Sequence, residues 1–243
     1  MQVDIVALII GRGNNTLPNK NILPVLGKPL IHYTAAAARR SKYIGRFYVS
    51  SDCPKILDAA GQAGYTPIVR PEELARPDSQ SPDAVKHALE IIERDGQTTI
   101  LIVQHANVGT IKTEWIDECI EGLLSDPSLS AIVPAHELSE YHPFRAKTFN
   151  SEGLLEPFFD FSRTPISANR QDLPPCYFFD HSIWALNVEN AIRSGNGQPP
   201  WQCMGNRIKP FVTSGCFDVH TIEDLNKTET WIRNNNIPIP NFP

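Results

Sequence analysis

The stretch that decides the fold is residues 5–21, IVALIIGRGNNTLPNKN. It opens with an unbroken apolar run, which is typical of a strand buried on both faces of a parallel sheet. Residues 11–21 are polar and contain two glycines and a proline, so they predict a loop at the carboxyl end of that strand. Residues 29–41 are amphipathic and rich in alanine, which predicts a helix. The chain therefore opens on a strand–loop–helix unit.

The same alternation of strands and helices continues to about residue 136. Further strands are predicted at 46–50, 66–69, 98–103 and 131–134, and helices at 54–63, 83–94 and 113–124. Such alternation with short connections predicts an α/β fold with a Rossmann-like, doubly wound and mostly parallel sheet. Ligands of these sheets bind at the carboxyl ends of the strands, where polar loops fall at 11–21, 50–52, 70–81 and 104–110.

The alternation breaks at residues 137–175, which are polar and aromatic and show no helical period. This segment predicts a small inserted β-arm or lid within a single domain of residues 1–243. The arm has few apolar periodic residues of its own, so we expect a partner subunit to stabilise it in a homodimer. The α/β pattern resumes at 177–186, followed by a strand–turn segment at 211–220, a helix at 221–234 and an extended, proline-rich tail.

Composition narrows the class of protein. The chain has 243 residues, is 41% hydrophobic and carries a net charge of −5, which argues against nucleic acid as a partner. The five cysteines are scattered without a CxxC pair, so they predict neither a disulfide framework nor a zinc site, and are typical of reduced cytosolic thiols. The first ten residues lack a basic segment and are too short to cross a bilayer. We expect a cytoplasmic protein with no membrane partner.

The loop at 11–21 has the chemistry of a phosphate site. Backbone N–H groups at the end of a strand, together with Arg12 and Lys20, are suited to phosphate oxygens. The loop is neither a Walker loop nor a GxGxxG turn. From these residues alone, a surface loop with two solvated charges is as reasonable an interpretation.

Several blocks along the chain resemble the CMP-sialic acid synthetases, or acylneuraminate cytidylyltransferases, together with the related CMP-Kdo-type enzymes. In the first loop, Arg12, Gly13, Pro18, Lys20 and Asn21 match the family's frame. The later blocks are VSSD at 49–52, RPEELA at 70–75, Gln104, RQDLPPCY at 170–177 and CFDVHT at 216–221. They occur in the family's order from about residue 5 to 232, so the resemblance covers most of the chain.

The resemblance implies a fold of the nucleotide-diphospho-sugar transferase type and an activity. CMP would be transferred from CTP to a sugar acid, either a sialic-acid-like nonulosonate or a Kdo-like acid, with release of pyrophosphate. Arg12, Lys20 and Asp218 would be catalytic. The nucleotide would contact Gly11, Arg12, Gly13, Asn14, Lys20, Asn21, Arg70, Ser81 and Gln104. The acidic acceptor would contact Gln104, Asn107, Arg170, Gln171, Tyr177 and Asp180.

The resemblance also implies a metal ion, with departures from the family pattern. Asp218 and His220 stand where the family has two aspartates, so Mg²⁺ is expected and Mn²⁺ is possible. The first loop is one residue shorter than in the family and lacks a triphosphate-binding lysine, which leaves Arg12 and Lys20 to balance the phosphate charge. Changes at His105–Asn107 and at Asp180-His181 favour an altered acceptor.

Other interpretations stay open at this point. The acceptor could be a small phosphonate or another non-sialic acid, or the chain could be a non-catalytic nucleotide-binding homologue. Related folds also include guanylyl- and uridylyltransferases that act on sugar phosphates. Single residues have simpler explanations too: Asp218 and His220 could cap the following helix, and Asp180 and His181 could pack at the arm.

Overall fold

The computed structural model of the protein describes residues 3–161, 166–214 and 216–242. Residues 162–165 of the expected arm, residue 215 of the expected 211–220 segment and residue 243 of the tail lie outside this part. The helices are α1 (Leu30–Arg39), α2 (Pro54–Gln62), α3 (Ser81–Ile92), α4 (Thr113–Ser125) and α5 (Ile222–Asn234). The strands are β1 (Ile5–Ile10), β2 (Pro24–Val25), β3 (Lys28–Pro29), β4 (Arg46–Ser51), β5 (Thr66–Val69), β6 (Ile100–His105), β7 (Ala131–Glu137), β8 (Lys147–Phe149), β9 (Leu155–Pro157), β10 (Tyr177–Phe179), β11 (Ile183–Asn187) and β12 (Ile208–Val212).

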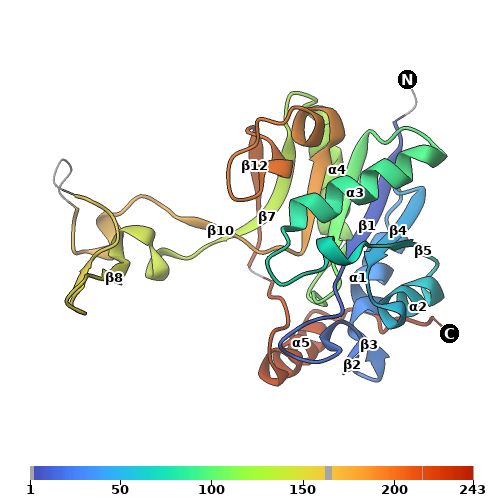
Figure 1. Cartoon of the computed structure of the whole chain (residues 1–243), viewed down its shortest axis with the longest axis horizontal. Helices are drawn as coiled ribbons and strands as arrows, with labels where there is room; N and C mark the ends of the chain where they lie inside the picture. Colours follow the sequence, from blue (N-terminus) through green and yellow to red (C-terminus); the bar gives the residue numbers. More distant parts are fainter. Residues whose placement is uncertain (1–2, 162–165, 215, 243) are drawn as a thin grey trace.

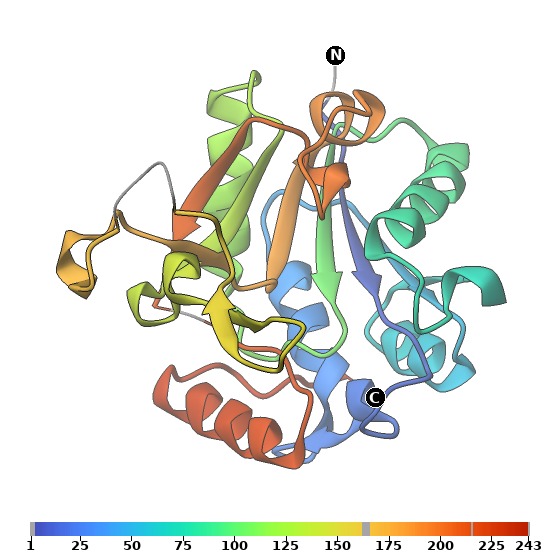
Figure 2. The same ribbon diagram turned by 60° about the vertical axis from the view of Figure 1, so that its left-hand side comes forward.

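One mixed sheet forms the centre of the molecule, in the order β10-β7-β11-β6-β1-β4-β5, with β12 also paired to β7 (Figures 1 and 2). β1 pairs in parallel with both β4 and β6, whereas β11 is antiparallel to both β6 and β7. From β1 the chain winds outward to β4 and β5 and then returns to the other side of β1 as β6. The strand order therefore reverses between β1 and β6, which is the point where such sheets bind ligands.

Helices cover both faces of this sheet, as expected for a doubly wound fold. Along β1, Ile5, Ala7 and Ile9 pack in a core with α1, α2 and α4. The alternate residues Val6, Leu8 and Ile10 pack in a second core with α3. Side chains of a strand alternate between faces, so a strand covered on both sides needs apolar residues throughout. This double burial explains the apolar run and confirms the predicted sheet.

The predicted elements are found with shifted boundaries. Helix α3 begins at Ser81, two residues before the predicted start, because Pro82 occupies its first turn, where the missing N–H forms no helical bond. The residue before α3 is Gln80, and its side chain makes no capping hydrogen bond. Strand β7 runs on to Glu137 because β10 pairs with its last three residues.

The segment between β7 and β10 leaves the sheet and forms an arm that extends away from the body (Figure 1). It carries a short antiparallel hairpin in which Thr148 pairs with Glu156. Three 3-10 turns complete the described part of the arm, at 139–141, 143–145 and 170–172. The segment has β character and no long helix among its described residues.

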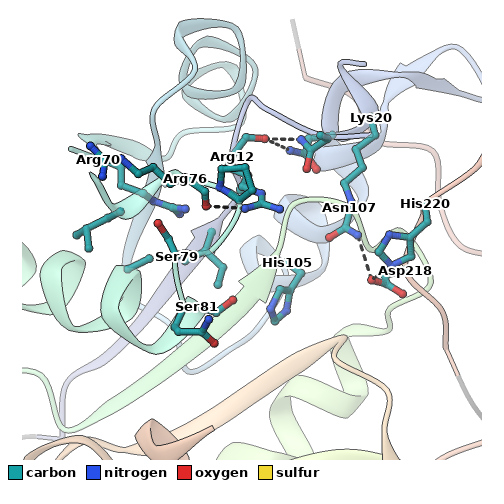
Figure 3. A pocket seen from close by; sticks show the side chains of 18 residues that line it. Arg12, Lys20, Arg70, Arg76, Ser79, Ser81, His105, Asn107, Asp218 and His220 are labelled. Carbon is teal, nitrogen blue, oxygen red and sulfur yellow. Dashed lines mark hydrogen bonds and ion pairs between the residues drawn. The ribbon is translucent and has the colours of Figure 1, made fainter. Parts of the chain in front are cut away.

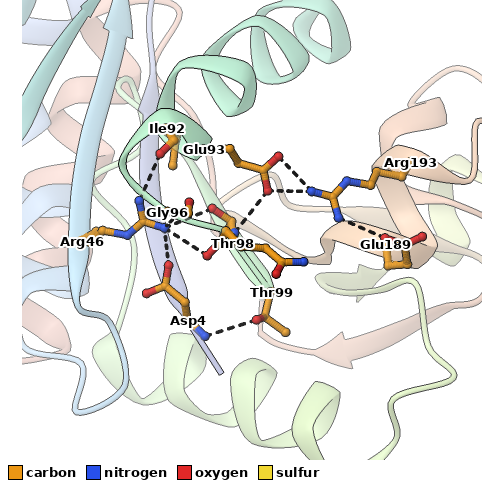
Figure 4. Close-up of polar contacts among 10 residues, drawn as sticks. Asp4, Arg46, Ile92, Glu93, Gly96, Thr98, Thr99, Glu189 and Arg193 are labelled. Carbon is orange, nitrogen blue, oxygen red and sulfur yellow. Dashed lines mark hydrogen bonds and ion pairs between the residues drawn. The ribbon is translucent and has the colours of Figure 1, made fainter. Parts of the chain in front are cut away.

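The amino ends of the strands are held together by paired charges (Figure 4). The guanidinium of Arg46 binds the Asp4 carboxylate and donates to the carbonyl oxygens of Ile92 and Gly96. Nearby, Arg193 forms a bidentate pair with Glu93, at 2.7 and 2.9 Å. These charges join β1, β4 and α3 and so serve the fold. The carboxyl ends of the strands, at the opposite edge of the sheet, carry the pocket described below.

Candidate active site

A pocket of about 260 Å³ lies at the carboxyl ends of β1 and β6, at the reversal of strand order. It is lined by Ile10, Gly11, Arg12, Asn15, Lys20, Asn21, Arg70, Leu74, Arg76, Pro77, Ser79, Gln80, Ser81, Ala84, His105, Asn107, Asp218 and His220. Among these side chains four are cationic and one is a carboxylate. The pocket therefore suits a polyanionic ligand.

The loop after β1 forms the floor of the pocket and depends on a close approach to β6. A Cβ at Gly11 would lie 2.7 Å from the Cβ of Ala106, so only glycine lets the two strand ends meet here. The loop then folds around the carbonyl oxygen of Arg12, which accepts from the side-chain amides of Asn15 and Asn21 at 2.6 and 3.0 Å. These bonds hold the backbone of the loop in a fixed curve beside the pocket.

Lys20 reaches the pocket through a tight turn. Asn19 is left-handed, with φ of 56°, a conformation that asparagine tolerates better than most residues. A 3-10 turn then begins at Lys20, whose N–H donates to Leu17 O at 3.2 Å. Burial lowers the pKa of Lys20, while Asp218 raises it and Arg12 lowers it. The ammonium group is therefore half-buried and lies among charged groups.

Two further arginines extend the cationic wall on the α3 side (Figure 3). Arg70 is buried, and its Nε and Nη2 donate to Ser50 Oγ and Ser50 O at 3.1 and 2.8 Å. Burial lowers the pKa of Arg70 to about 10, so it stays charged at neutral pH. Arg76 lines the same wall, and its carbonyl oxygen accepts from Arg12 Nη1 at 2.7 Å. Arg70 and Arg76 thus add two cations to the pocket beside Arg12 and Lys20.

Asp218 stands on the opposite side of the pocket, next to Asn107 and His220 (Figure 3). Asn107 Nδ2 donates to Asp218 Oδ2 at 3.2 Å, and Val219 N–H donates to Asn107 O at 2.9 Å. Thr110 and Phe217 exchange two hydrogen bonds of 3.0 Å in the same region. The loop after β6 thus places the carboxylate, although the two segments are more than 100 residues apart in sequence.

The donors near Asp218 fit a metal ion of the kind that binds through one carboxylate and substrate phosphates, as Mg²⁺ does. Asp218 is partly exposed and faces the pocket. Nε2 of His220 is engaged in this arrangement, because it lies 2.7 Å from Asp218 Oδ2 and carries the proton of that bond, so the lone pair of the neutral ring is on Nδ1. Among the described residues, no three His, Cys, Asp or Glu side chains are grouped to hold a metal ion. A metal here would depend on oxygens of the ligand.

Gln104 was expected to contact nucleotide and acceptor, and the structure corrects this. Its side chain is fully buried under α1. The amide nitrogen donates to Thr34 O and Thr34 Oγ1, and the amide oxygen accepts from Tyr65 Oη at 3.1 Å. With donor and acceptor both engaged in the core, Gln104 fixes β6 against α1 and does not line the pocket.

Asp180 is corrected for a similar reason. It is buried, and its carboxylate accepts from Ser182 Oγ and Thr213 Oγ1, each at 2.8 Å. Two residues of the first loop also lie outside the pocket lining: Gly13, whose N–H donates to Asp52 Oδ1 at 2.8 Å, and the exposed Asn14. The Asp52 carboxylate thus holds the loop.

The other predicted acceptor contacts lie at the arm. Arg170 and Gln171 line a second hollow at its base, together with Glu137 and Glu140. Tyr177 is 47% exposed on β10. These three residues are not brought together with Lys20 and Asp218 in one chain, so their contact with an acceptor stays a prediction.

Nine of the lining residues are additions to the predicted set, among them Asn15, Arg76 and His105. Arg76 belongs to the polar loop at 70–81, and its position after the end of a predicted strand was the available signal. His105 directly follows Gln104, and strand alternation puts two neighbours on opposite faces. Gln104 was predicted as the contact residue, but Gln104 faces the core and His105 faces the pocket.

Comparison with known proteins agrees with the fold. Residues 6–175 match the family model described as cytidylyltransferase, which covers most of the chain. The chain therefore belongs to the cytidylyltransferase family.

Individual relatives differ in how much of their length is matched. The CMP-N,N'-diacetyllegionaminic acid synthase of Legionella pneumophila is 42% identical over 197 residues, 78% of this chain and 81% of the relative. The N-acylneuraminate cytidylyltransferase of Streptococcus agalactiae is 28% identical over 74% of this chain, which spans only 42% of that relative. A solved CMP:2-keto-3-deoxy-manno-octonic acid synthetase, complexed with CTP, has a TM-score of 0.67 at 20% identity and covers 96% of this chain and 99% of its own. That similarity supports the fold.

A search of the described residues for a helix that is both long and apolar enough to cross a membrane finds none.

Proposed function

We propose that the chain transfers CMP from CTP to a nonulosonate, a nine-carbon sugar acid of the legionaminic or sialic acid type. The observation that carries this proposal is the 42% identity to a legionaminic acid synthase over about four-fifths of both chains. A pocket with four cationic side chains at the ligand-binding edge of the sheet supports it, since a nucleoside triphosphate is strongly anionic.

Different cations of the pocket contact different parts of the nucleotide in this proposal. On the β1 side, the phosphates contact the Lys20 side chain and the backbone N–H groups near Arg12. On the α3 side, they contact the side chains of Arg12 and Arg76. Arg70, Ser81 and Asn21 frame the ribose and the base. Arg12 is held at its guanidinium by the Arg76 carbonyl, so it is positioned before the ligand arrives.

The acceptor hydroxyl attacks the α-phosphorus of CTP in line, and the bond from that phosphorus to the bridging oxygen breaks as pyrophosphate leaves. Charge spreads over the phosphoryl oxygens during this step. Lys20 and Arg12 stabilise that charge because both cations line the pocket, where Arg12 is already held by the Arg76 carbonyl. Asp218 would hold a divalent ion, Mg²⁺ or Mn²⁺, and such an ion would neutralise phosphate charge.

Pyrophosphate release with a panel of acceptors tests this function. With CTP and Mg²⁺, we expect turnover with legionaminic, sialic or pseudaminic acid, and at least 10-fold lower kcat/KM with Kdo or small phosphonates, because a pocket built for one substrate discriminates by a few kcal/mol. UTP and GTP in place of CTP should give less thermal stabilisation of the protein at equal concentration. Turnover confined to a phosphonate would contradict the acceptor class, and nucleotide binding without turnover would indicate a non-catalytic homologue.

The arm forms a dimer interface in this proposal. Six of the large exposed hydrophobic side chains fall between residues 141 and 159, among them Phe149 at 73% and Leu155 at 67% exposed. The hairpin β8–β9 is too small to bury them itself, and a hairpin alone is marginally stable in water. Large exposed apolar side chains gathered on one short segment favour an interaction site, and a second copy of the chain is the partner that covers them.

Sedimentation or light scattering tests the dimer. The double variant Phe149→Asp/Leu155→Asp should convert a dimer into a monomer at micromolar concentration, because each charge would have to be buried in the interface. Val69→Asp is the matched control, since Val69 is also 73% exposed but lies on β5 in the body. A monomeric wild-type chain, or a dimer unaffected by the arm variants, would contradict the interface.

A further inference from the structure

His105 lines the pocket but has no part in the proposal above. It is the last residue of β6 and pairs with Ile10 across the reversal of strand order. Its Nδ1 lies 2.9 Å from the carbonyl oxygen of His181. A carbonyl oxygen only accepts, so Nδ1 must carry the proton of this bond. The neutral ring therefore bears its lone pair on Nε2.

The partner carbonyl is itself held firmly. His181 is left-handed, with φ of 52°, and forms the turn between β10 and β11. Its Nδ1 accepts from Trp184 Nε1 at 3.2 Å, and its ring lies against Trp201 at 4.8 Å between centroids. The His105 ring packs edge-on to Trp184 at 4.7 Å. Ring position and tautomer of His105 are thus set by groups behind the pocket wall.

The charge state agrees with this tautomer. Burial lowers the pKa of His105 to about 4, with a further lowering from His181. The ring is therefore neutral near pH 7. Arg12, Lys20, Arg70 and Arg76 are donors without acceptor capacity, and phosphate oxygens occupy such donors. A hydroxyl group in this pocket needs an acceptor. The proposed function assigns Asp218 to the metal ion, and Oδ2 of Asp218 also accepts from Asn107 and His220.

We infer that Nε2 of His105 accepts a hydrogen bond from the attacking hydroxyl of the sugar acid and aligns that oxygen with the α-phosphorus. The inference rests on the proposed function. His105 lies on the β11 side of the phosphate loop (Figure 3), so it faces the phosphates from the side opposite the arginines. As the oxygen–phosphorus bond forms and pyrophosphate leaves, the hydroxyl proton moves along this hydrogen bond to Nε2, and water takes it up after product release.

Two substitutions of His105 distinguish the role of Nδ1 from the role of Nε2. His105→Asn keeps a donor near Nδ1 for the His181 carbonyl but has no acceptor at the Nε2 position. His105→Gln places its amide oxygen near the Nε2 position. We expect His105→Asn to lower kcat by about 10- to 100-fold, in the range of positioned proton-accepting groups, with KM for CTP within about 2-fold. His105→Gln should recover at least 3-fold of that loss.

Steady-state kinetics with CTP and legionaminic acid, and calorimetric titration with CTP alone, give the readouts. A kcat of His105→Asn within 3-fold of wild type, an equal loss in both variants, or a loss confined to CTP affinity would overturn the inference while leaving the proposed function intact. A wild-type chain that turns over no sugar acid would contradict the proposed function first.

If His105→Asn does not fold, Trp184→Phe serves as a second variant. It should lower kcat a few-fold at unchanged KM for CTP, since it removes the donor that orients His181. An unchanged kcat would count against the inference.

Discussion

Replacing Lys20 with alanine should lower kcat by about 100-fold, which corresponds to about 2.7 kcal/mol of lost transition-state stabilisation. Lys20 is the cation that the first loop delivers between Arg12 and Asp218. The left-handed Asn19 and the 3-10 turn that follows fix where its side chain starts. A fixed ammonium group needs no reorganisation when phosphoryl charge develops, so its loss affects the transition state more than the bound substrate.

The measurement is steady-state pyrophosphate release with saturating CTP, accompanied by a thermal unfolding curve. Lys55→Ala serves as the control, because Lys55 is an exposed lysine on α2 outside the pocket lining and its removal changes the net charge by the same amount. Lys20→Arg should keep part of the activity, since the charge remains but the guanidinium differs in shape from an ammonium group. A kcat of Lys20→Ala within a few-fold of wild type would remove Lys20 from the catalytic set.

Replacing Asp218 with asparagine should lower kcat by about 100-fold or more and raise the Mg²⁺ concentration needed for half-maximal activity. Asp218 is the carboxylate among the described pocket residues, and metal ions contribute several kcal/mol to phosphoryl transfer. An asparagine at this position can keep a contact with the Asn107 amide through its oxygen, so the change removes charge with little effect on the loop.

A titration of activity with Mg²⁺ and with Mn²⁺ distinguishes the two candidates for metal ligand. His220→Ala should change kcat by less than about 3-fold if His220 only donates to Asp218, as its 2.7 Å contact indicates. Should His220→Ala shift the metal requirement as far as Asp218→Asn does, His220 is a ligand after rearrangement. Asp58→Asn on α2 is the charge-matched control away from the pocket. Unchanged metal dependence in Asp218→Asn would argue against Asp218 as the metal-binding carboxylate.

The sequence predicted the fold better than it predicted the pocket. Apolar runs such as β1 and β6 identify buried strands because only a strand covered on both faces needs apolar residues at every position. The pocket depends on finer detail. In β6, Ile100 and Ile102 pack toward α1, and Gln104 has the same parity, so it also points into that core. His105 has the opposite parity and lines the pocket.

What the sequence determined by itself was the sheet, the polar loop at residues 11–21 that follows its first strand, and the family. These follow from local patterns and from the order of short blocks along the chain. The tertiary structure decided which side chains meet. Asp218 faces the pocket because Asn107 and Thr110 bind its segment from more than 100 residues away. Arg12 donates to the Arg76 carbonyl oxygen, and Gln104 forms hydrogen bonds with Thr34 and Tyr65. All of these contacts join elements that are distant in sequence. Such pairings depend on how the helices pack on the sheet, which local sequence does not encode.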